Sequence, residues 1–147
     1  MTKRPVPRLT RTNLGFLLAK ASQHWNEILY ARFCEEGFSQ VRPSFGAILV
    51  PLFEEDGLRL GELARRIRLS KQTMTTMVRL VEKADLVITR PDEEDGRATR
   101  VYLTRAAQRF RPVAEKVLAE LERRAAHVDG RAALDDVRFW LDRYTSR

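Results

Sequence analysis

The 147-residue sequence contains one cysteine, Cys34, so an intramolecular disulfide framework is excluded. The lack of disulfides favours a reducing compartment, and we expect a cytoplasmic protein. Apolar runs as long as a signal peptide or a membrane span are also missing, including after the basic segment 1–11. A chain of this length can bury one sizeable core without cross-links, as one domain or as two small lobes that share the core.

The short motifs of common enzymes are absent as well. The sequence has no phosphate-binding P-loop, no GxSxG nucleophile turn and no dinucleotide-binding fingerprint. Its two lone histidines and one distant cysteine do not make a zinc site, and we expect neither a metal nor a cofactor. These absences favour a binding protein over an enzyme.

Positive charge is present in excess. Lys and Arg number 27 against 20 Asp and Glu, which gives a formal net charge of +7. This balance indicates either a polyanionic partner or only a cationic surface that keeps the protein soluble, and composition does not decide between the two. The positions of the charges have to decide.

Apolar side chains at steps of three and four residues predict a mainly helical chain. A long helix is expected from about Asn13 to Glu36, and a second one starts at Pro43, with a kink at Pro51. Near the other end of the chain, Thr104 is expected to cap a long helix, and Gly130 separates that helix from the last one. Long amphipathic helices of this kind need a partner surface.

The middle of the chain combines two short helices with a hairpin. The first short helix is expected at Leu60–Ser70, and Ser70 caps the second, which runs from Lys71 to about Ala84. Two β-capable runs, Val87–Arg90 and Thr99–Leu103, then flank an acidic loop tip at residues 92–95. Two short helices followed by a two-stranded ribbon form a winged helix-turn-helix.

The outer face of the second short helix carries side chains suited to the major groove of DNA. Gln can hydrogen-bond adenine, Thr can contact thymine, and Arg can bond guanine or phosphate. An ordinary solvated face commonly uses Glu and Lys, yet no acidic residue occurs between Lys71 and Arg79. We therefore predict contacts with the major groove by Gln72, Thr73, Thr75, Thr76 and Arg79.

The stretch LGELARRIRLSKQTMTTMVRLVEKADLVITRPDEEDGRATRVYLT, from Leu60 to Thr104, resembles the core of the MarR family of bacterial transcription regulators. The likeness rests on LxxLA followed by a Ser-capped helix, on a wing with an Asp-x-Arg tip, and on a Thr-capped long helix. The flanking helices resemble the dimerisation helices of that family. The implied fold is mainly α with a small two-stranded β-wing, in which N- and C-terminal dimerisation helices flank the winged helix-turn-helix.

The resemblance implies three parts: a basic, flexible arm (1–11), a helical dimerisation region (12–40 with 105–147) and a DNA-binding region (41–104). It also implies a homodimer that binds a pseudo-palindromic operator in double-stranded DNA, with recognition helices about one turn, roughly 34 Å, apart. We expect a repressor that a small aromatic or anionic effector releases from DNA.

In the family, an arginine of the wing tip enters the minor groove. It corresponds here to Arg97, with Asp95 as its supporting ion-pair partner. The other acidic residues of the tip, Asp92–Glu94, are expected to point away from phosphate or to pair with Arg59, Arg90 or Arg100. The expected phosphate contacts are Arg65, Arg66, Arg68, Ser70, Lys71, Arg90 and Arg100. Three positions depart from the family pattern: Arg68 and Asp85 replace glycine, and Leu80 replaces a polar residue.

Several assignments stay open between two interpretations. The candidates for a dimer interface, or equally for intrachain core, are Phe16, Trp25, Val137, Phe139, Trp140 and Tyr144. The candidates for an effector pocket are Arg11, His24, Trp25 and Tyr30. Cys34 is expected to be a buried, inert thiol, with a redox-sensing regulator as the alternative. A further alternative is a winged-helix dimer that docks a protein partner through the acidic tip and Leu80, without recognising a specific operator.

Overall fold

The computed structural model describes residues 9–146, in which six α-helices, a short 3-10 helix and a small antiparallel sheet follow one another. The elements are α1 (Leu14–Glu35), η1 (Pro43–Phe45), α2 (Gly46–Glu54), β1 (Leu58–Arg59), α3 (Leu60–Arg66), α4 (Lys71–Lys83), β2 (Val87–Pro91), β3 (Thr99–Leu103), α5 (Arg105–Asp129) and α6 (Arg131–Thr145). Most of the predicted arm 1–11 lies outside the described residues. Within them, no helix has the length and hydrophobicity needed to cross a membrane.

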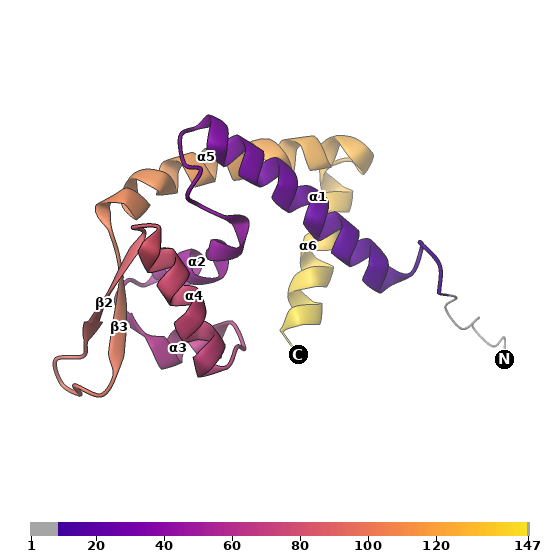
Figure 1. The fold of residues 1–147 in the computed structure, drawn as a ribbon. Coiled ribbons are helices and arrows are strands. Elements are labelled where there is room, and N and C mark those ends of the chain that lie inside the picture. Colours follow the sequence, from indigo (N-terminus) through magenta and orange to yellow (C-terminus); the bar gives the residue numbers. More distant parts are fainter. Residues whose placement is uncertain (1–8, 147) are drawn as a thin grey trace, which may run out of the picture.

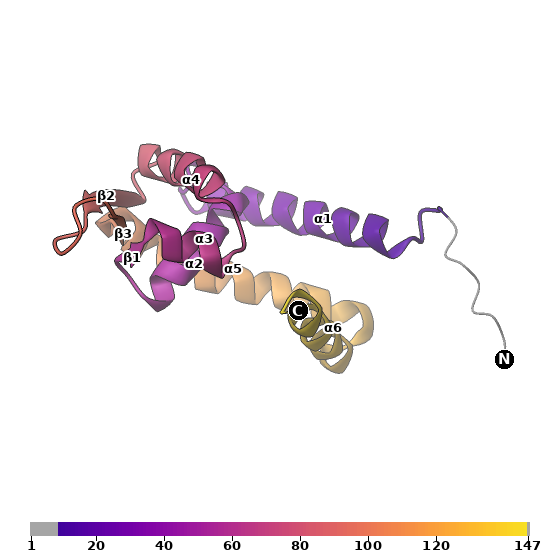
Figure 2. The same ribbon diagram turned by 90° about the horizontal axis from the view of Figure 1, so that it is seen from below.

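The molecule consists of a lobe and a helical extension (Figure 1). Helices α2, α3 and α4 pack with the sheet in the lobe, while α1 and α5 extend away from it and α6 folds back from the end of α5. Figure 2 shows the same division from below, with α1 and α5 diverging beyond the lobe. This arrangement agrees with the predicted mainly helical winged fold.

Three helices begin where a side chain satisfies a free backbone N–H group, and the caps at Ser70 and Thr104 are the predicted ones. The side chain of Asn13 accepts from the N–H of Phe16 at 3.3 Å, and Ser70 Oγ accepts from the N–H of Thr73 at 3.1 Å. Thr104 Oγ1 accepts from the N–H of Ala107 at 3.2 Å. Since these partners lie only three residues away, short-range sequence signals are enough to locate these helix starts.

The first short helix ends earlier than predicted. Helix α3 stops at Arg66 instead of Ser70, because Arg68 adopts a left-handed backbone conformation with φ of 55°. Asp85 has φ of 62° after α4, and its carbonyl oxygen accepts from Thr104 Oγ1 at 2.7 Å. Both are positions where glycine was expected from the resemblance, and both show the backbone conformation that glycine favours.

One hydrophobic core joins the lobe to the start of the extension. Its fully buried side chains come from α2, α3, α4, the sheet and α5, with Ile48, Leu63, Met74 and Val101 among them. Aromatic rings continue this core into the extension, where Phe33 of α1 meets Phe110 of α5 edge to face, with ring centroids 4.8 Å apart. The lobe is thereby fixed to both long helices.

The sheet has one strand more than predicted. The hairpin β2–β3 has the predicted pairing, with Val87 opposite Leu103 and Pro91 opposite Thr99. Strand β1 adds to the free edge of β3, so that Leu58 lies opposite Val101, and the strand order is β1-β3-β2. A strand of two residues is too short to show an alternating pattern in the sequence. We call β2, β3 and the loop between them the wing.

Cys34 is exposed, so the prediction of a buried thiol was wrong. Its neighbour Phe33 belongs to the buried face of α1, and each residue of an α-helix is turned by about 100° from the one before. Apolar neighbours in the sequence therefore did not imply a buried cysteine.

Candidate nucleic-acid interface

Helix α4 has one buried and one exposed face. The buried face consists of Met74, Val78 and Val81. The exposed face carries four of the five residues predicted to contact the major groove: Gln72, Thr73, Thr76 and Arg79. The fifth, Thr75, is half-buried. The core thus holds α4 so that its polar side chains face away from the lobe.

The threonines of α4 use their hydroxyl groups locally. Thr75 and Thr76 donate to the carbonyl oxygens four residues earlier, at 2.9 and 3.2 Å, and Thr73 Oγ1 accepts from Ser70 Oγ at 2.8 Å. A threonine bonded in this way leaves its methyl group available for contact. Within residues 9–146, Gln72 and Arg79 make no side-chain hydrogen bond, so their donors are available to a partner.

The wing tip holds Arg97 outward. Its side chain is 98% exposed, and its Nε lies 3.7 Å from the carboxylate of Asp95. The same carboxylate accepts from the backbone N–H of Arg97 at 3.1 Å, and the carbonyl oxygen of Asp95 accepts from the N–H of Ala98 at 2.9 Å. The predicted ion pair is therefore present, and Asp95 also shapes the turn that carries Arg97.

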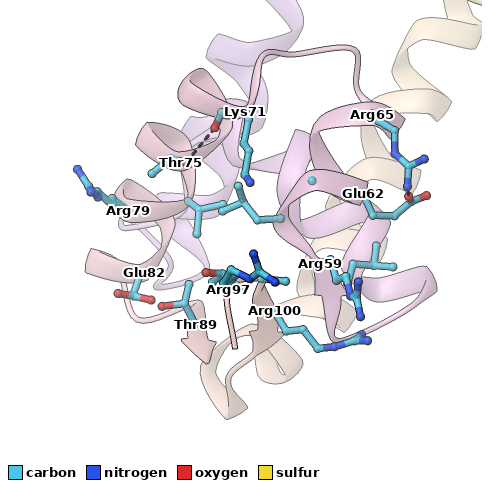
Figure 3. Close-up of a pocket in the computed structure, with 16 residues that line it drawn as sticks. Arg59, Glu62, Arg65, Lys71, Thr75, Arg79, Glu82, Thr89, Arg97 and Arg100 are labelled. Carbon is cyan, nitrogen blue, oxygen red and sulfur yellow. Dashed lines mark hydrogen bonds and ion pairs between the residues drawn. The ribbon is translucent and has the colours of Figure 1, made fainter. Parts of the chain in front are cut away.

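A cleft of about 820 Å³ lies between α3, α4 and the wing. Figure 3 shows Lys71, Thr75 and Arg79 on its α4 side, with Glu62 and Arg65 of α3 on the opposite side. Its lining contains more cationic than anionic side chains. The six cationic ones are Arg59, Arg65, Lys71, Arg79, Arg97 and Arg100, and the two carboxylates are Glu62 and Glu82. We call it the basic cleft. Its excess of positive charge suits a polyanionic ligand.

Three of the predicted phosphate contacts already have carboxylate partners in the chain. Arg65 pairs with Glu62, and Arg66 pairs with Glu55 at 2.6 Å and Glu62 at 3.3 Å. The hydrogen bond to Glu55 raises the pKa of Arg66 above its ordinary value, with a further contribution from Glu62. Arg100 pairs with Asp92 at 2.8 Å. All three keep the remaining guanidinium surface for other contacts.

The other predicted phosphate contacts lie around the N-terminal end of α4 and on the wing. Arg68 is exposed in the turn before α4, Lys71 is exposed in its first turn, and Arg90 is exposed on β2 opposite Arg100. Ser70 is the N-cap of α4. Contact of these groups with DNA stays a prediction.

The acidic tip is divided between the interior and the surface. Asp92 is buried and pairs with Arg59 and Arg100, two of the partners expected for the tip. Glu93 and Glu94 are exposed. A single buried carboxylate therefore accounts for part of the acidic run, and it anchors the start of the wing loop.

Sequence reasoning did not assign Arg59 to the DNA-binding site. Its side chain lines the basic cleft because β1 pairs with β3 and so places Arg59 opposite Arg100. Thr89, Thr99 and Glu82 line the cleft as well. No short sequence motif predicts these residues, since four separate elements (β1, α4, β2 and β3) supply them. In the described part of the chain, no group of three or more His, Cys, Asp or Glu side chains could hold a metal ion.

The predicted effector-pocket residues do not line the apolar cavity beside the core. That cavity, of about 340 Å³, lies between α1, α2 and α5, and its walls include Phe33, Leu49 and Phe110. The four predicted residues lie elsewhere. Arg11 is near the start of α1, His24 is exposed, Trp25 packs against the core, and Tyr30 donates to the carbonyl oxygen of Ser39 at 2.7 Å.

Five of the six interface candidates are exposed in this chain: Phe16, Val137, Phe139, Trp140 and Tyr144. The sixth, Trp25, is half-buried against the core, in agreement with the alternative of intrachain core. On α6, the rings of Trp140 and Tyr144 stack with centroids 4.8 Å apart. Helix α6 packs against α5 but contains no buried residue, so most of its large apolar side chains stay exposed within the described chain.

Comparison with known proteins agrees with this geometry. The model of the MarR family matches residues 43–99. No curated protein matches the sequence closely enough to count as a relative.

Three solved structures illustrate the likeness in fold. The transcriptional repressor CouR, bound to a 23-mer DNA duplex, has a TM-score of 0.78 at 20% identity, covering 95% of this chain and 99% of its own. The PcaV regulator from Streptomyces coelicolor, in complex with its natural ligand, has a TM-score of 0.74 at 20% identity, covering 96% and 97%. A probable transcriptional regulator from Pseudomonas aeruginosa has a TM-score of 0.73 at 24% identity, covering 90% and 97%. The match to the MarR family model at residues 43–99 thus covers the helix-turn-helix and strand β2, and the chain as a whole has the fold of MarR-family regulators.

Proposed function

We propose that this protein is a homodimeric, sequence-specific DNA-binding transcription regulator, acting as a repressor and not as an enzyme. The observation that carries the proposal is the basic cleft beside α4 and the wing. Its lining has six cationic side chains and only two carboxylates. A cleft with this charge attracts the phosphate backbone, and the polar face of α4 beside it has the dimensions and chemistry for a major groove.

In this proposal the DNA contacts divide into two kinds. Gln72 and Arg79 hydrogen-bond base edges, while Thr73, Thr75 and Thr76 offer methyl groups to thymine. Arg97 enters the adjacent minor groove, where a narrow groove concentrates negative potential. Lys71 and the arginines around it contact phosphates, which position the protein but carry no sequence information.

The second copy of the chain is the partner proposed for the extension. Between α1 and α6 lies an open hollow of about 830 Å³, lined by Leu14, Leu18 and Ala21 on one side and by Val137, Phe139 and Trp140 on the other. Large exposed apolar patches mark interaction sites. A two-fold dimer formed by residues 12–40 and 105–147 would place two α4 helices about one DNA turn, roughly 34 Å, apart.

The apolar cavity is the proposed effector site. Its volume of about 340 Å³ suits a small aromatic molecule, and Arg42 stands in its lining as the partner for an anionic group, whereas Arg111 already pairs with Glu115 at 3.1 Å. Both arginines also lie over aromatic rings, 5.7 Å from the centroid of Tyr30 and 5.3 Å from that of Phe53. The structure of PcaV with its natural ligand supports such a mode of regulation. Titration with aromatic carboxylates such as benzoate should raise the unfolding temperature and weaken DNA binding.

Selection from a pool of random duplex DNA at physiological salt tests the proposal. Enrichment of a pseudo-palindrome with half-sites about one turn, roughly 34 Å, apart is the expected result. Salt-dependent binding without enrichment would contradict operator recognition. Absence of binding at low salt as well would favour the protein-docking alternative, for which the 54% exposure of Leu80 on α4 is the supporting observation.

A further inference from the structure

Asp92 is the buried centre of a two-arginine cluster at the point where strand β2 ends and the loop of the wing begins. Its Oδ2 accepts from Nε of Arg59 and from Nε of Arg100, both at 2.8 Å. Its Oδ1 accepts from the backbone N–H groups of Glu94 at 2.9 Å and Asp95 at 3.4 Å. The carboxylate is therefore bonded on both oxygens, and the two guanidinium groups are held on one side of it.

The way in which the arginines bind Asp92 leaves other donors available. Arg59 uses only Nε, and Arg100 uses Nε together with Nη1, which donates to the carbonyl oxygen of Gly57 at 2.8 Å. Within residues 9–146, both Nη groups of Arg59 and Nη2 of Arg100 donate to no protein group. Both side chains are partly exposed, at 43% and 35%, and line the basic cleft.

The charge of the cluster also points to an anion. Two guanidinium groups around one carboxylate leave one net positive charge facing the cleft. Hydrogen bonds from the backbone of Glu94 and from Arg100 lower the pKa of Asp92 to about 2, against the effect of burial, so the carboxylate is ionised at neutral pH. Figure 3 shows Arg59 and Arg100 side by side at the end of the cleft away from Arg65 and Lys71.

We propose that Arg59 and Arg100 form a phosphate clamp for one DNA phosphodiester, and that Asp92 is the positioning residue that holds both arginines in place. The clamp rests on the proposed function, because its ligand is the DNA backbone. It lies on the same side of the cleft as the strands of the wing, and so fixes the position of the wing on the duplex. The clamp adds Arg59 to the DNA contacts and gives Asp92 a function in binding despite its negative charge.

The substitution Asp92→Asn tests the clamp by the sign of its effect. It removes a negative charge, so simple electrostatic attraction predicts tighter binding to any duplex. The clamp predicts weaker binding, by about tenfold, because an Asn amide N–H₂ group would face donors where a carboxylate accepts now. The probe is a fluorescent duplex of random sequence, measured by anisotropy at several salt concentrations.

Arg59→Lys is the second variant, and it keeps the charge. A lysine cannot bond Asp92 through one nitrogen and phosphate through another, since it has a single ammonium group. We expect about tenfold weaker binding and a salt slope that is smaller by about 1, as for the loss of one phosphate contact. The matched control is Arg109→Lys on α5, which is exposed and lies outside the basic cleft, and should bind like the wild type.

The outcomes separate this inference from the proposed function. Weaker binding by Asp92→Asn and Arg59→Lys, with Arg109→Lys unchanged, supports the clamp. Binding of Arg59→Lys at wild-type strength and slope overturns it, whether or not Asp92→Asn folds. Unchanged or tighter binding by a folded Asp92→Asn variant, checked by its urea midpoint, overturns it too. If the wild type binds no duplex at low salt, the proposed function itself fails, and the clamp fails with it.

Discussion

At the scale of the residue, Arg97 is expected to contribute to DNA binding and hardly at all to folding. Its side chain is almost fully exposed, and its one ion pair, with Asp95, lies at the surface. Surface ion pairs contribute about 0 to 1 kcal/mol to stability. In the minor groove, by contrast, the same guanidinium would lie among phosphates and base edges.

We therefore predict that Arg97→Ala weakens operator binding by about 1 to 3 kcal/mol and leaves the urea midpoint nearly unchanged. Anisotropy titration with the selected operator and urea denaturation measure the two quantities. Arg109→Ala, the same change on α5 outside the basic cleft, is the control. Equal affinities of wild type and Arg97→Ala would remove the wing tip from the mechanism.

The lowered pKa of Asp92 predicts how the stability of the protein changes in acid. This pKa is about 2 in the folded chain, below the ordinary value of 3.8, chiefly through the backbone hydrogen bond from Glu94. A depressed pKa means that the ionised carboxylate stabilises the fold. This stabilisation is complete above about pH 4 and is lost as the pH falls through 4 to 2.

The free energy of unfolding of the wild type should thus fall more steeply between pH 4 and pH 2 than that of Asp92→Asn, which has no carboxyl group to titrate there. Urea denaturation at constant ionic strength, in steps from pH 5 to pH 2, measures both curves. Parallel curves for the two proteins would contradict the assignment of this acid-sensitive contribution to Asp92.

At the scale of the element, the start of α4 depends on one hydroxyl group. Ser70 Oγ accepts from the N–H of Thr73 at 3.1 Å and donates to Thr73 Oγ1 at 2.8 Å. Ser70→Ala should lower the free energy of unfolding by about 1 kcal/mol through loss of the N-cap. Ser22→Ala, at an exposed position inside α1, is the control and should not destabilise, because alanine favours helix interiors. A Ser70→Ala variant as stable as Ser22→Ala would show that other contacts fix this helix start.

At the scale of the whole molecule, the proposed dimer predicts that α6 forms part of its interface. Phe139 is 64% exposed on a helix that buries no residue in its own chain. Phe139→Glu should convert a dimer into a monomer, because a carboxylate cannot be buried in an apolar interface without a partner. Light scattering after size-exclusion chromatography measures the mass. Leu80→Glu, a similar change at 54% exposure on α4, should leave the dimer intact. A wild-type monomer at micromolar concentration would contradict the proposed interface.

The sequence by itself determined the features that depend on near neighbours. Asn13, Ser70 and Thr104 cap helices through partners three residues away. The spacing of the apolar residues in α4 indicates which face of the helix is buried and which is exposed. The hairpin was predictable for the same reason, since its strands are joined by a short loop. The ion pair between Asp95 and Arg97 also spans only two residues.

Only the tertiary structure decided the features that join distant segments. Strand β1 pairs with β3, which lies about 40 residues later in the sequence. This pairing brings Arg59 close to Arg100 and to Asp92, which is 33 residues away in the sequence. The same packing turned Cys34 outward, buried one carboxylate of the acidic tip and formed the apolar cavity from α1, α2 and α5. A local pattern fixes which residues form a helix or strand, but it contains no information on which distant surface will meet them, because that depends on the packing of the whole core.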